Sequence, residues 1–93
     1  MNDRDIEMRA IAHYGVKHQI IKLFEEFSEL QKELCKFLDG KNNREAIAEE
    51  TGDVLILLDQ LILMFDMEDE VMESKHKKLE RLLERMVTVY GAT

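Results

Sequence analysis

Apolar residues recur every three to four positions along most of the chain, a spacing that predicts α-helices rather than strands. The pattern is strongest over 16–38, where apolar residues fall at 20, 21, 23, 24, 27, 30, 34, 37 and 38. Weaker versions predict further helices over 3–13, 44–66 and 68–87, and residues 88–93 are expected to form a loose tail. The chain contains no proline, which agrees with an all-α fold.

A polar segment at 39–43, with the sequence DGKNN, separates the two longest predicted helices. Asp, Gly and Asn favour turns and helix caps, and two helices joined by a short turn form an antiparallel hairpin. The helix over 44–66 becomes apolar on nearly every side, so one of its surfaces is expected to be covered by another subunit. We therefore expect one all-α domain over 1–93: an antiparallel helical hairpin plus flanking helices, with a four-helix-bundle core completed as a homodimer or homotetramer.

Charge and composition narrow the classes of partner. The formal net charge is −7, and the basic stripe typical of proteins that bind nucleic-acid polymers is not expected. The apolar run at 54–65 is too short to span a membrane and is interrupted by Asp59 and Gln60. The acidic first ten residues do not resemble a secretory signal, and the single cysteine, Cys35, cannot form an internal disulfide. These features predict a soluble, cytoplasmic protein.

Two pairs of acidic residues, three positions apart within each pair, lie on the predicted hairpin: Glu26 with Glu29, and Glu50 with Asp53. Residues three apart share a helix face, and the two pairs are equally distant from the 39–40 junction, so we expect them at one height above the turn. Carboxylates that meet at ~4 Å repel by on the order of 4 kcal/mol per pair at an effective dielectric near 20. Mg²⁺ or Mn²⁺ would relieve this repulsion, since both prefer oxygen ligands.

A solvated, salt-bridged helix face is the alternative interpretation of these acids. Three pairs are spaced for such bridges: Lys22 with Glu26, Glu29 with Lys32, and Glu33 with Lys36. Each acidic run is explained by this alternative when taken alone. The matched height of the two runs favours the metal site.

The motif EFSE at 26–29, a spacer of twenty residues and the motif ETGD at 50–53 together resemble a known signature. It is the ExxE…ExxD pattern of the MazG-like, all-α nucleoside triphosphate pyrophosphohydrolases, especially the short single-domain members. The surrounding segments QIIKLFEEFSELQKEL and AEETGDVLILLDQL are similar to the two motif helices of that superfamily. The resemblance covers about 14–83.

This resemblance implies a Mg²⁺-dependent enzyme that hydrolyses a nucleoside triphosphate to the monophosphate and pyrophosphate. It implies that Glu26, Glu29, Glu50 and Asp53 act as catalytic metal ligands. It further implies that basic residues of the last helix meet the substrate phosphates and that residues before the first motif line the nucleoside: Lys75, Lys78 and Arg81 for the phosphates, and His18, Gln19 and Lys22 for the nucleoside.

Several roles stay open at the level of sequence. The proton acceptor is Glu25, Glu29, Glu33 or Glu50. Tyr14 and Phe24 are the candidates for stacking on a base, although Phe24 is expected in the core. The basic stripe has a purely structural alternative, a surface paired with Glu73, Glu80 and Glu84. A buried Asp59 would need a partner, which we expect at a subunit contact.

Two other functions compete with the triphosphatase. The phosphoribosyl-ATP pyrophosphohydrolase of histidine synthesis belongs to the same superfamily and shares the acidic pattern. A non-catalytic helical dimerisation module would need the helices and not the acids.

Overall fold

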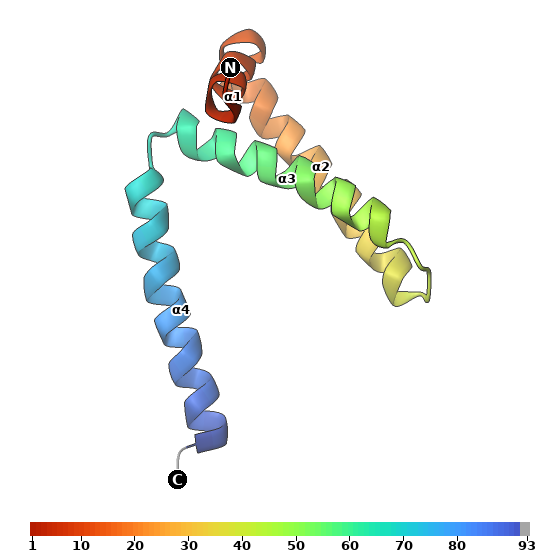
Figure 1. Ribbon diagram of the computed structural model, residues 1–93, viewed down its shortest axis with the longest axis vertical. Helices are drawn as coiled ribbons and strands as arrows, with labels where there is room; N and C mark the ends of the chain where they lie inside the picture. The colour runs from red at the N-terminus through yellow and green to blue at the C-terminus, as the bar shows by residue number, and fades with distance from the viewer. Residues whose placement is uncertain (92–93) are drawn as a thin grey trace.

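The computed structural model describes the backbone of residues 1–91 and the side chains of residues 1–87. Within that range the chain forms four α-helices and no strand, which confirms the all-α prediction (Figure 1). The helices are α1 (Asp3–Tyr14), α2 (Val16–Leu38), α3 (Arg44–Met64) and α4 (Glu68–Gly91). None of the described helices combines the length and the apolar character that crossing a membrane requires.

Three helix ends differ from the predicted ones, and the smallest difference is that α1 ends at Tyr14 rather than at 13. Helix α3 stops at Met64 rather than at 66, because Asp66 adopts a left-handed conformation with φ of 48°. The N–H of Met67 then donates to the carbonyl of Ile62 at 3.2 Å, as in a Schellman motif. Helix α4 continues to Gly91, so the prediction of a loose tail is wrong for 88–91. The rest of that predicted tail, 92–93, lies outside the described residues.

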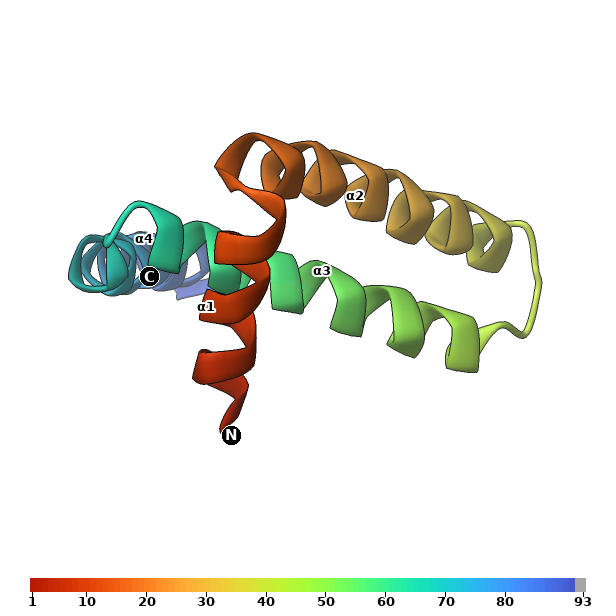
Figure 2. The same ribbon diagram turned by 90° about the horizontal axis from the view of Figure 1, so that it is seen from above.

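Helices α2 and α3 form the predicted antiparallel hairpin and lie side by side along most of their length (Figure 2). Gly40, with φ of 95°, ends α2 in the left-handed conformation that glycine tolerates best. The N–H of Lys41 donates to the carbonyl of Lys36 at 3.1 Å, which closes a second Schellman motif. Asn43 then holds the turn against α2 through a hydrogen bond from Nδ2 to the carbonyl of Glu33 at 2.8 Å.

Helix α1 lies across the open end of the hairpin, where it contacts both α2 and α3 (Figure 2). The side chain of Asn2 caps its first turn by accepting a hydrogen bond from the N–H of Asp5 at 2.8 Å. Gly15, with φ of 90°, ends α1 and begins α2, so the chain turns sharply at one residue. None of the residues of α1 is buried.

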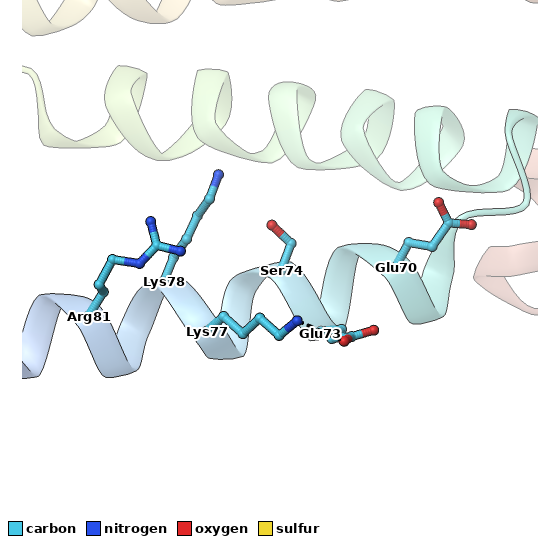
Figure 3. A pocket seen from close by; sticks show the side chains of 6 residues that line it. All are labelled: Glu70, Glu73, Ser74, Lys77, Lys78 and Arg81. Carbon is cyan, nitrogen blue, oxygen red and sulfur yellow. Dashed lines mark ion pairs between the residues drawn. The ribbon is translucent and has the colours of Figure 1, made fainter.

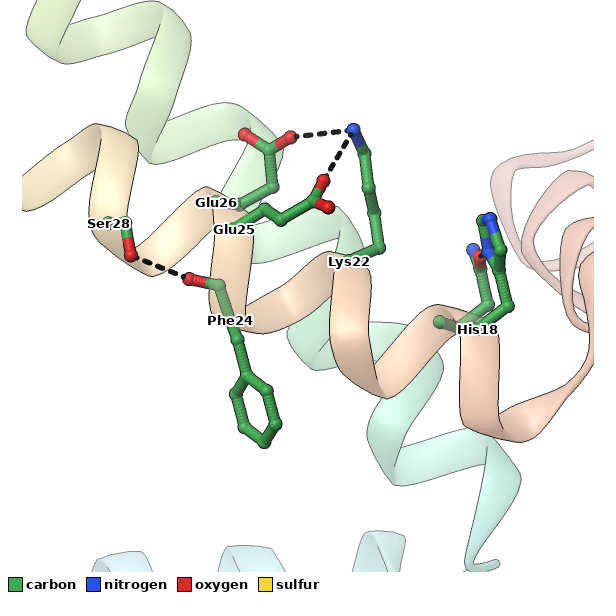
Figure 4. A network of polar contacts seen from close by, with 7 residues as sticks. His18, Lys22, Phe24, Glu25, Glu26 and Ser28 are labelled. Carbon is green, nitrogen blue, oxygen red and sulfur yellow. Dashed lines mark hydrogen bonds and ion pairs between the residues drawn. The ribbon is translucent and has the colours of Figure 1, made fainter.

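The core of the single chain is small. Among the described side chains, the buried apolar residues are Leu23, Val54 and Leu57, all in the hairpin. Phe24 was expected in the core, but it is 60% exposed and its ring points away from the acidic side chains (Figure 4). Helix α4 leaves the end of α3 and extends away from the hairpin (Figure 1). One chain therefore does not close a four-helix bundle by itself.

Candidate metal centre

The centre of the hairpin carries a group of converging carboxylates. Glu26 projects from α2, and Glu50 and Asp53 project from α3. One carboxylate oxygen from each of these residues lies within 4.8 Å of the others. The antiparallel hairpin explains the meeting, because its turn at 39–43 brings position 26 opposite position 53. All three donors are carboxylate oxygens, a set that fits Mg²⁺ or Mn²⁺ better than zinc.

Glu29 belongs to the same surface but not to the converging group. It lines a pocket with Glu26, Glu50 and Asp53, and the other lining residues are Lys22, Glu25 and Ser28. Its side chain is exposed, and its oxygens do not join the group held within 4.8 Å. The structure thus brings together three of the four acids that the sequence singles out, with the fourth at the wall of the same pocket.

The electrostatic strain of the site is centred on Glu50, which is half-buried. The pKa of its carboxyl is raised, first by loss of solvation on burial and then by the negative charges of Asp53 and Glu26. Glu29 and Glu33 add to the effect from farther along α2. A raised carboxyl pKa means that the anionic form of Glu50 is disfavoured where it stands. A bound cation would reverse this, because it favours the anion.

Basic side chains neutralise only one side of the acidic group. Lys22 Nζ lies 3.3 Å from Glu25 Oε2 and 3.4 Å from Glu26 Oε1, as the dashed lines in Figure 4 show. These contacts raise the pKa of Lys22, with the hydrogen bond to Glu25 as the largest cause. The predicted Lys22–Glu26 pair is therefore present. No Lys or Arg of the described chain lies within 4 Å of the carboxylates of Glu50 and Asp53.

Glu33 has a structural role that the sequence did not reveal. Lys36 Nζ donates to Glu33 Oε2 at 3.0 Å, and Asn43 Nδ2 donates to Glu33 Oε1 at 3.1 Å. Both hydrogen bonds lower the pKa of the Glu33 carboxyl, that from Lys36 the more. The predicted Glu33–Lys36 pair is present, whereas no ion pair between Glu29 and Lys32 forms in the part of the chain described. Glu33 fastens the turn to α2 and is not a free proton acceptor.

The residues predicted to line a nucleoside form a second pocket, at the start of α2. Its volume is about 420 Å³, and its lining residues are Tyr14, His18, Gln19, Ile21, Lys22 and Glu25. His18 is exposed and stacks on Tyr14, with ring centroids 4.9 Å apart and an angle of 15° between the planes. Gln19 is only 4% exposed and bonds to a buried residue of α3. Lys22 and Glu25 line this pocket and the acidic pocket alike, so the two adjoin.

The predicted phosphate-binding residues lie on α4, away from the acids. Lys78 and Arg81 line a concave surface on α4 together with Glu70, Glu73, Ser74 and Lys77 (Figure 3). Lys75 does not line it. The polar side of α4 also holds ion pairs, Lys77 with Glu73 at 3.1 Å and His76 with Glu80 at 3.0 Å. No residue of this surface lines the acidic pocket, so a single chain does not bring the two sets together.

Asp59, for which a partner at a subunit contact is expected, has no partner within one chain among the described residues. It is exposed and lines the edge between α1 and α3 with Asp3 and Glu7.

Comparison with known proteins found no protein-family model, curated protein or solved structure that matches this chain.

Proposed function

We propose that this protein is a Mg²⁺-dependent nucleoside triphosphate pyrophosphohydrolase of the MazG-like type. The observation that carries the proposal is the convergence of Glu26, Glu50 and Asp53 from two helices, with no basic partner for the two acids of α3 among the described residues. Such an arrangement is unfavourable alone and becomes favourable with a divalent cation. The adjoining pocket with stacked aromatic rings supports a substrate that has a charged end and a planar end.

In this proposal Glu26, Glu50 and Asp53 hold the metal. Mg²⁺ bound there would polarise phosphate oxygens, activate a water molecule and offset the charge of the triphosphate. The oxygen of water attacks the α-phosphorus, the bond from that phosphorus to the α–β bridging oxygen breaks, and its electron pair leaves with pyrophosphate. We assign the acceptance of the water's proton to Glu29, because it lines the same pocket and stands outside the converging group.

Lys22 stands where the two pockets join, with its ammonium against Glu25 and Glu26. A flexible ammonium at this place suits a phosphate oxygen next to the sugar, which it would bind as a point charge. The Tyr14–His18 pair then lies at the end of the site suited to the base. Lys78 and Arg81 are proposed to reach the leaving phosphates from a second copy of the chain, since they do not reach them within one.

Homo-oligomerisation is supported by the amount of surface that one chain leaves exposed. The chain exposes 7724 Å², against about 5,600 Å² for a compact folded monomer of this mass. Its radius of gyration is 17.2 Å, against about 12 Å for a compact domain of this length. The difference in area, about 2,000 Å² per chain, is of the scale that obligate homodimers bury. The occupant proposed for the exposed apolar face of α4 is a second copy, as a homodimer or a pair of dimers.

The same surface favours the second candidate, a helical dimerisation module without catalysis. The two functions differ in what a divalent cation does. A cation site that exists only in the folded state stabilises that state when Mg²⁺ or Mn²⁺ is added, so the unfolding temperature rises. At a free cation concentration of 100 times Kd, the free energy of unfolding increases by about 2.7 kcal/mol. A dimer held by apolar contacts and surface salt bridges gains no comparable stability.

The decisive test combines catalysis and cation binding in matched variants. We expect Glu50→Gln and Asp53→Asn to lower the rate of pyrophosphate release by about 100-fold or more, the scale of losing a group that acts in the transition state. Glu50→Gln should also raise the unfolding temperature in EDTA, because it removes one member of a repelling group, and should abolish the gain with Mg²⁺.

Glu49→Gln is the control, since Glu49 is exposed, adjacent in sequence and absent from the acidic pocket. It should keep the parent rate and the parent response to Mg²⁺. A panel of nucleoside triphosphates and phosphoribosyl-ATP separates the two enzymatic alternatives. Parent-like hydrolysis by Glu50→Gln would show that the carboxylates of the hairpin are not the catalytic site.

A further inference from the structure

Two glutamines form a buried hydrogen bond at the open end of the hairpin. Gln19 on α2 is 4% exposed, and Gln60 on α3 is 3% exposed, so both are buried as deeply as the apolar core. Gln19 Nε2 donates to Gln60 Oε1 at 2.8 Å. Burying an amide is costly unless it is hydrogen-bonded, and an apolar pair would fill the same space without that requirement. The pair therefore calls for an explanation beyond packing.

The direction of this hydrogen bond determines which ring nitrogen of the neighbouring His18 carries the hydrogen. Because Gln19 uses its amino group on Gln60, its carbonyl oxygen, Oε1, faces His18 Nδ1 at 2.7 Å. A carbonyl oxygen can only accept, so Nδ1 must carry the hydrogen. A neutral imidazole protonated on Nδ1 has a lone pair on Nε2. Among the described residues, none bonds to Nε2.

The ring of His18 is also held on one face. Tyr14 stacks on it, and Tyr14 is itself met edge-on by His13, with ring centroids 4.7 Å apart. His18 is thus restrained through Nδ1 by an amide anchored in the core and through its face by an aromatic ring. Both restraints act in the pocket that adjoins the acidic site.

We propose that Gln60 is a positioning residue which, through Gln19, presents His18 Nε2 as a hydrogen-bond acceptor for the exocyclic amino group of an aromatic heterocycle. The proposal rests on the proposed function, because the adjoining acidic pocket supplies the phosphate end of the ligand. An exocyclic amino group projects its N–H beyond the ring. In uracil the ring position that carries the amino group of cytosine carries a carbonyl oxygen instead, and its lone pair would face that of Nε2. Cytosine and adenine nucleotides are therefore favoured over uracil nucleotides.

The first test measures the tautomer directly, by ¹⁵N NMR of the imidazole of His18 in the full chain near pH 8. The parent is expected to show one tautomer, with hydrogen on Nδ1. Gln60→Met removes the acceptor and should give a mixture of tautomers, whereas Gln60→Glu keeps an acceptor oxygen and should restore the Nδ1–H form. Gln31→Met is the matched control, because Gln31 is an exposed glutamine of α2. An Nε2–H tautomer in the parent overturns the proposal.

The second test measures binding of CMP and UMP in the presence of Mg²⁺, which needs no turnover. CMP should bind at least 10-fold more tightly than UMP to the parent, and the ratio should fall below about 3 in Gln60→Met and in His18→Phe. Hydrolysis of the triphosphates should show the same change in KM, with kcat altered less than threefold. Equal binding of CMP and UMP by the parent, or binding of neither, overturns the proposal.

The outcomes separate this inference from the proposed function. A chain that hydrolyses no triphosphate but keeps the Nδ1–H tautomer and the preference for CMP contradicts the enzymatic function and supports this one. A chain that hydrolyses triphosphates with the same preference in Gln60→Met as in the parent supports the enzyme and contradicts this inference. Circular dichroism of each variant shows whether its helices are kept, and Gln60→Glu and His18→Phe provide the comparison should Gln60→Met not fold.

Discussion

The α2–α3 hairpin and α4 are both long amphipathic helical segments, yet they use their apolar faces differently. The hairpin buries Leu23, Val54 and Leu57 within one chain. On α4, Leu79 is 53% exposed and Leu83 is 59% exposed. The hairpin can bury its face because a short turn returns α3 along α2. The turn before α4, with Asp66 in the left-handed conformation, directs most of that helix away from the hairpin.

This difference shows that helix formation depends on nearby residues in the sequence, whereas helix packing depends on residues elsewhere. The residues of α4 are sufficient to predict its helix, since its apolar positions follow the helical spacing. Which surface the helix packs against depends on residues outside α4. In the hairpin, the helix that covers α2 follows it after a turn of only five residues, 39–43.

The largest expected effect comes from charging the apolar face of α4. Leu79→Glu combined with Leu83→Glu should convert an oligomer into single chains of 11.0 kDa, because a buried charge without a partner opposes association. Light scattering coupled to gel filtration measures the mass. Glu84→Gln, on the polar side of α4, should leave the mass unchanged. An unchanged mass in the double variant would mean that α4 does not form the interface.

The next largest effect concerns the core of the hairpin. Leu57→Ala should lower the free energy of unfolding by about 2–5 kcal/mol, as expected for a leucine that is 5% exposed. The loss should be independent of protein concentration when the protein is fully assembled. Leu83→Ala should instead act through association, so its effect on the unfolding temperature should grow as the protein is diluted. Similar concentration dependence in both variants would remove the distinction between the two regions.

The two regions also differ in how much of them could be predicted from the sequence. For the hairpin, the helices, the turn and the meeting of Glu26 with Glu50 and Asp53 follow from helical spacing and from counting outward from the turn. The exposed position of Glu29 does not follow, because it depends on the rotation of α2 about its axis. Helical spacing does not determine this rotation closely enough to decide which of two neighbouring positions faces α3.

Side-chain environments were harder to predict than helices. Gln19 was expected to line the nucleoside site, and it does line the pocket at the start of α2. Its burial and its hydrogen bond to Gln60 could not be predicted without knowing which residue of α3 lies opposite it. Phe24 was expected in the core because apolar residues usually are, yet one chain has no surface to cover it. The end of α3 was misplaced by two residues, because the signal for a stop was Asp66 rather than a glycine.

A smaller effect should come from the turn that makes the hairpin possible. Asn43→Ala removes two hydrogen bonds to Glu33, at 2.8 and 3.1 Å, and should cost about 1 kcal/mol of stability. Asn42→Ala is the matched control, since Asn42 is exposed and adjacent. Chemical denaturation measures both. Equal losses in the two variants would mean that the turn is stabilised by its backbone alone and that the register of the acids does not depend on Asn43.

The smallest expected effect lies where α1 meets the hairpin, and its sign depends on pH. The pKa of Glu7 is raised, first by burial and then by the charges of Asp59 and Asp3. A carboxyl whose pKa is raised on folding stabilises the fold most below its unfolded value of 4.5, and this contribution is lost as the pH rises through the folded pKa. Glu7→Gln should therefore stabilise the packing of α1 at pH 7 by about 0.5 kcal/mol, the scale of one surface charge interaction, and should give little gain at pH 4. Hydrogen exchange of the α1 amides at the two pH values measures this, with Glu49→Gln as the control. A gain of equal size at both pH values would mean that Glu7 acts on α1 through packing and not through charge, so that this contact, unlike the acids of the hairpin, carries no electrostatic strain.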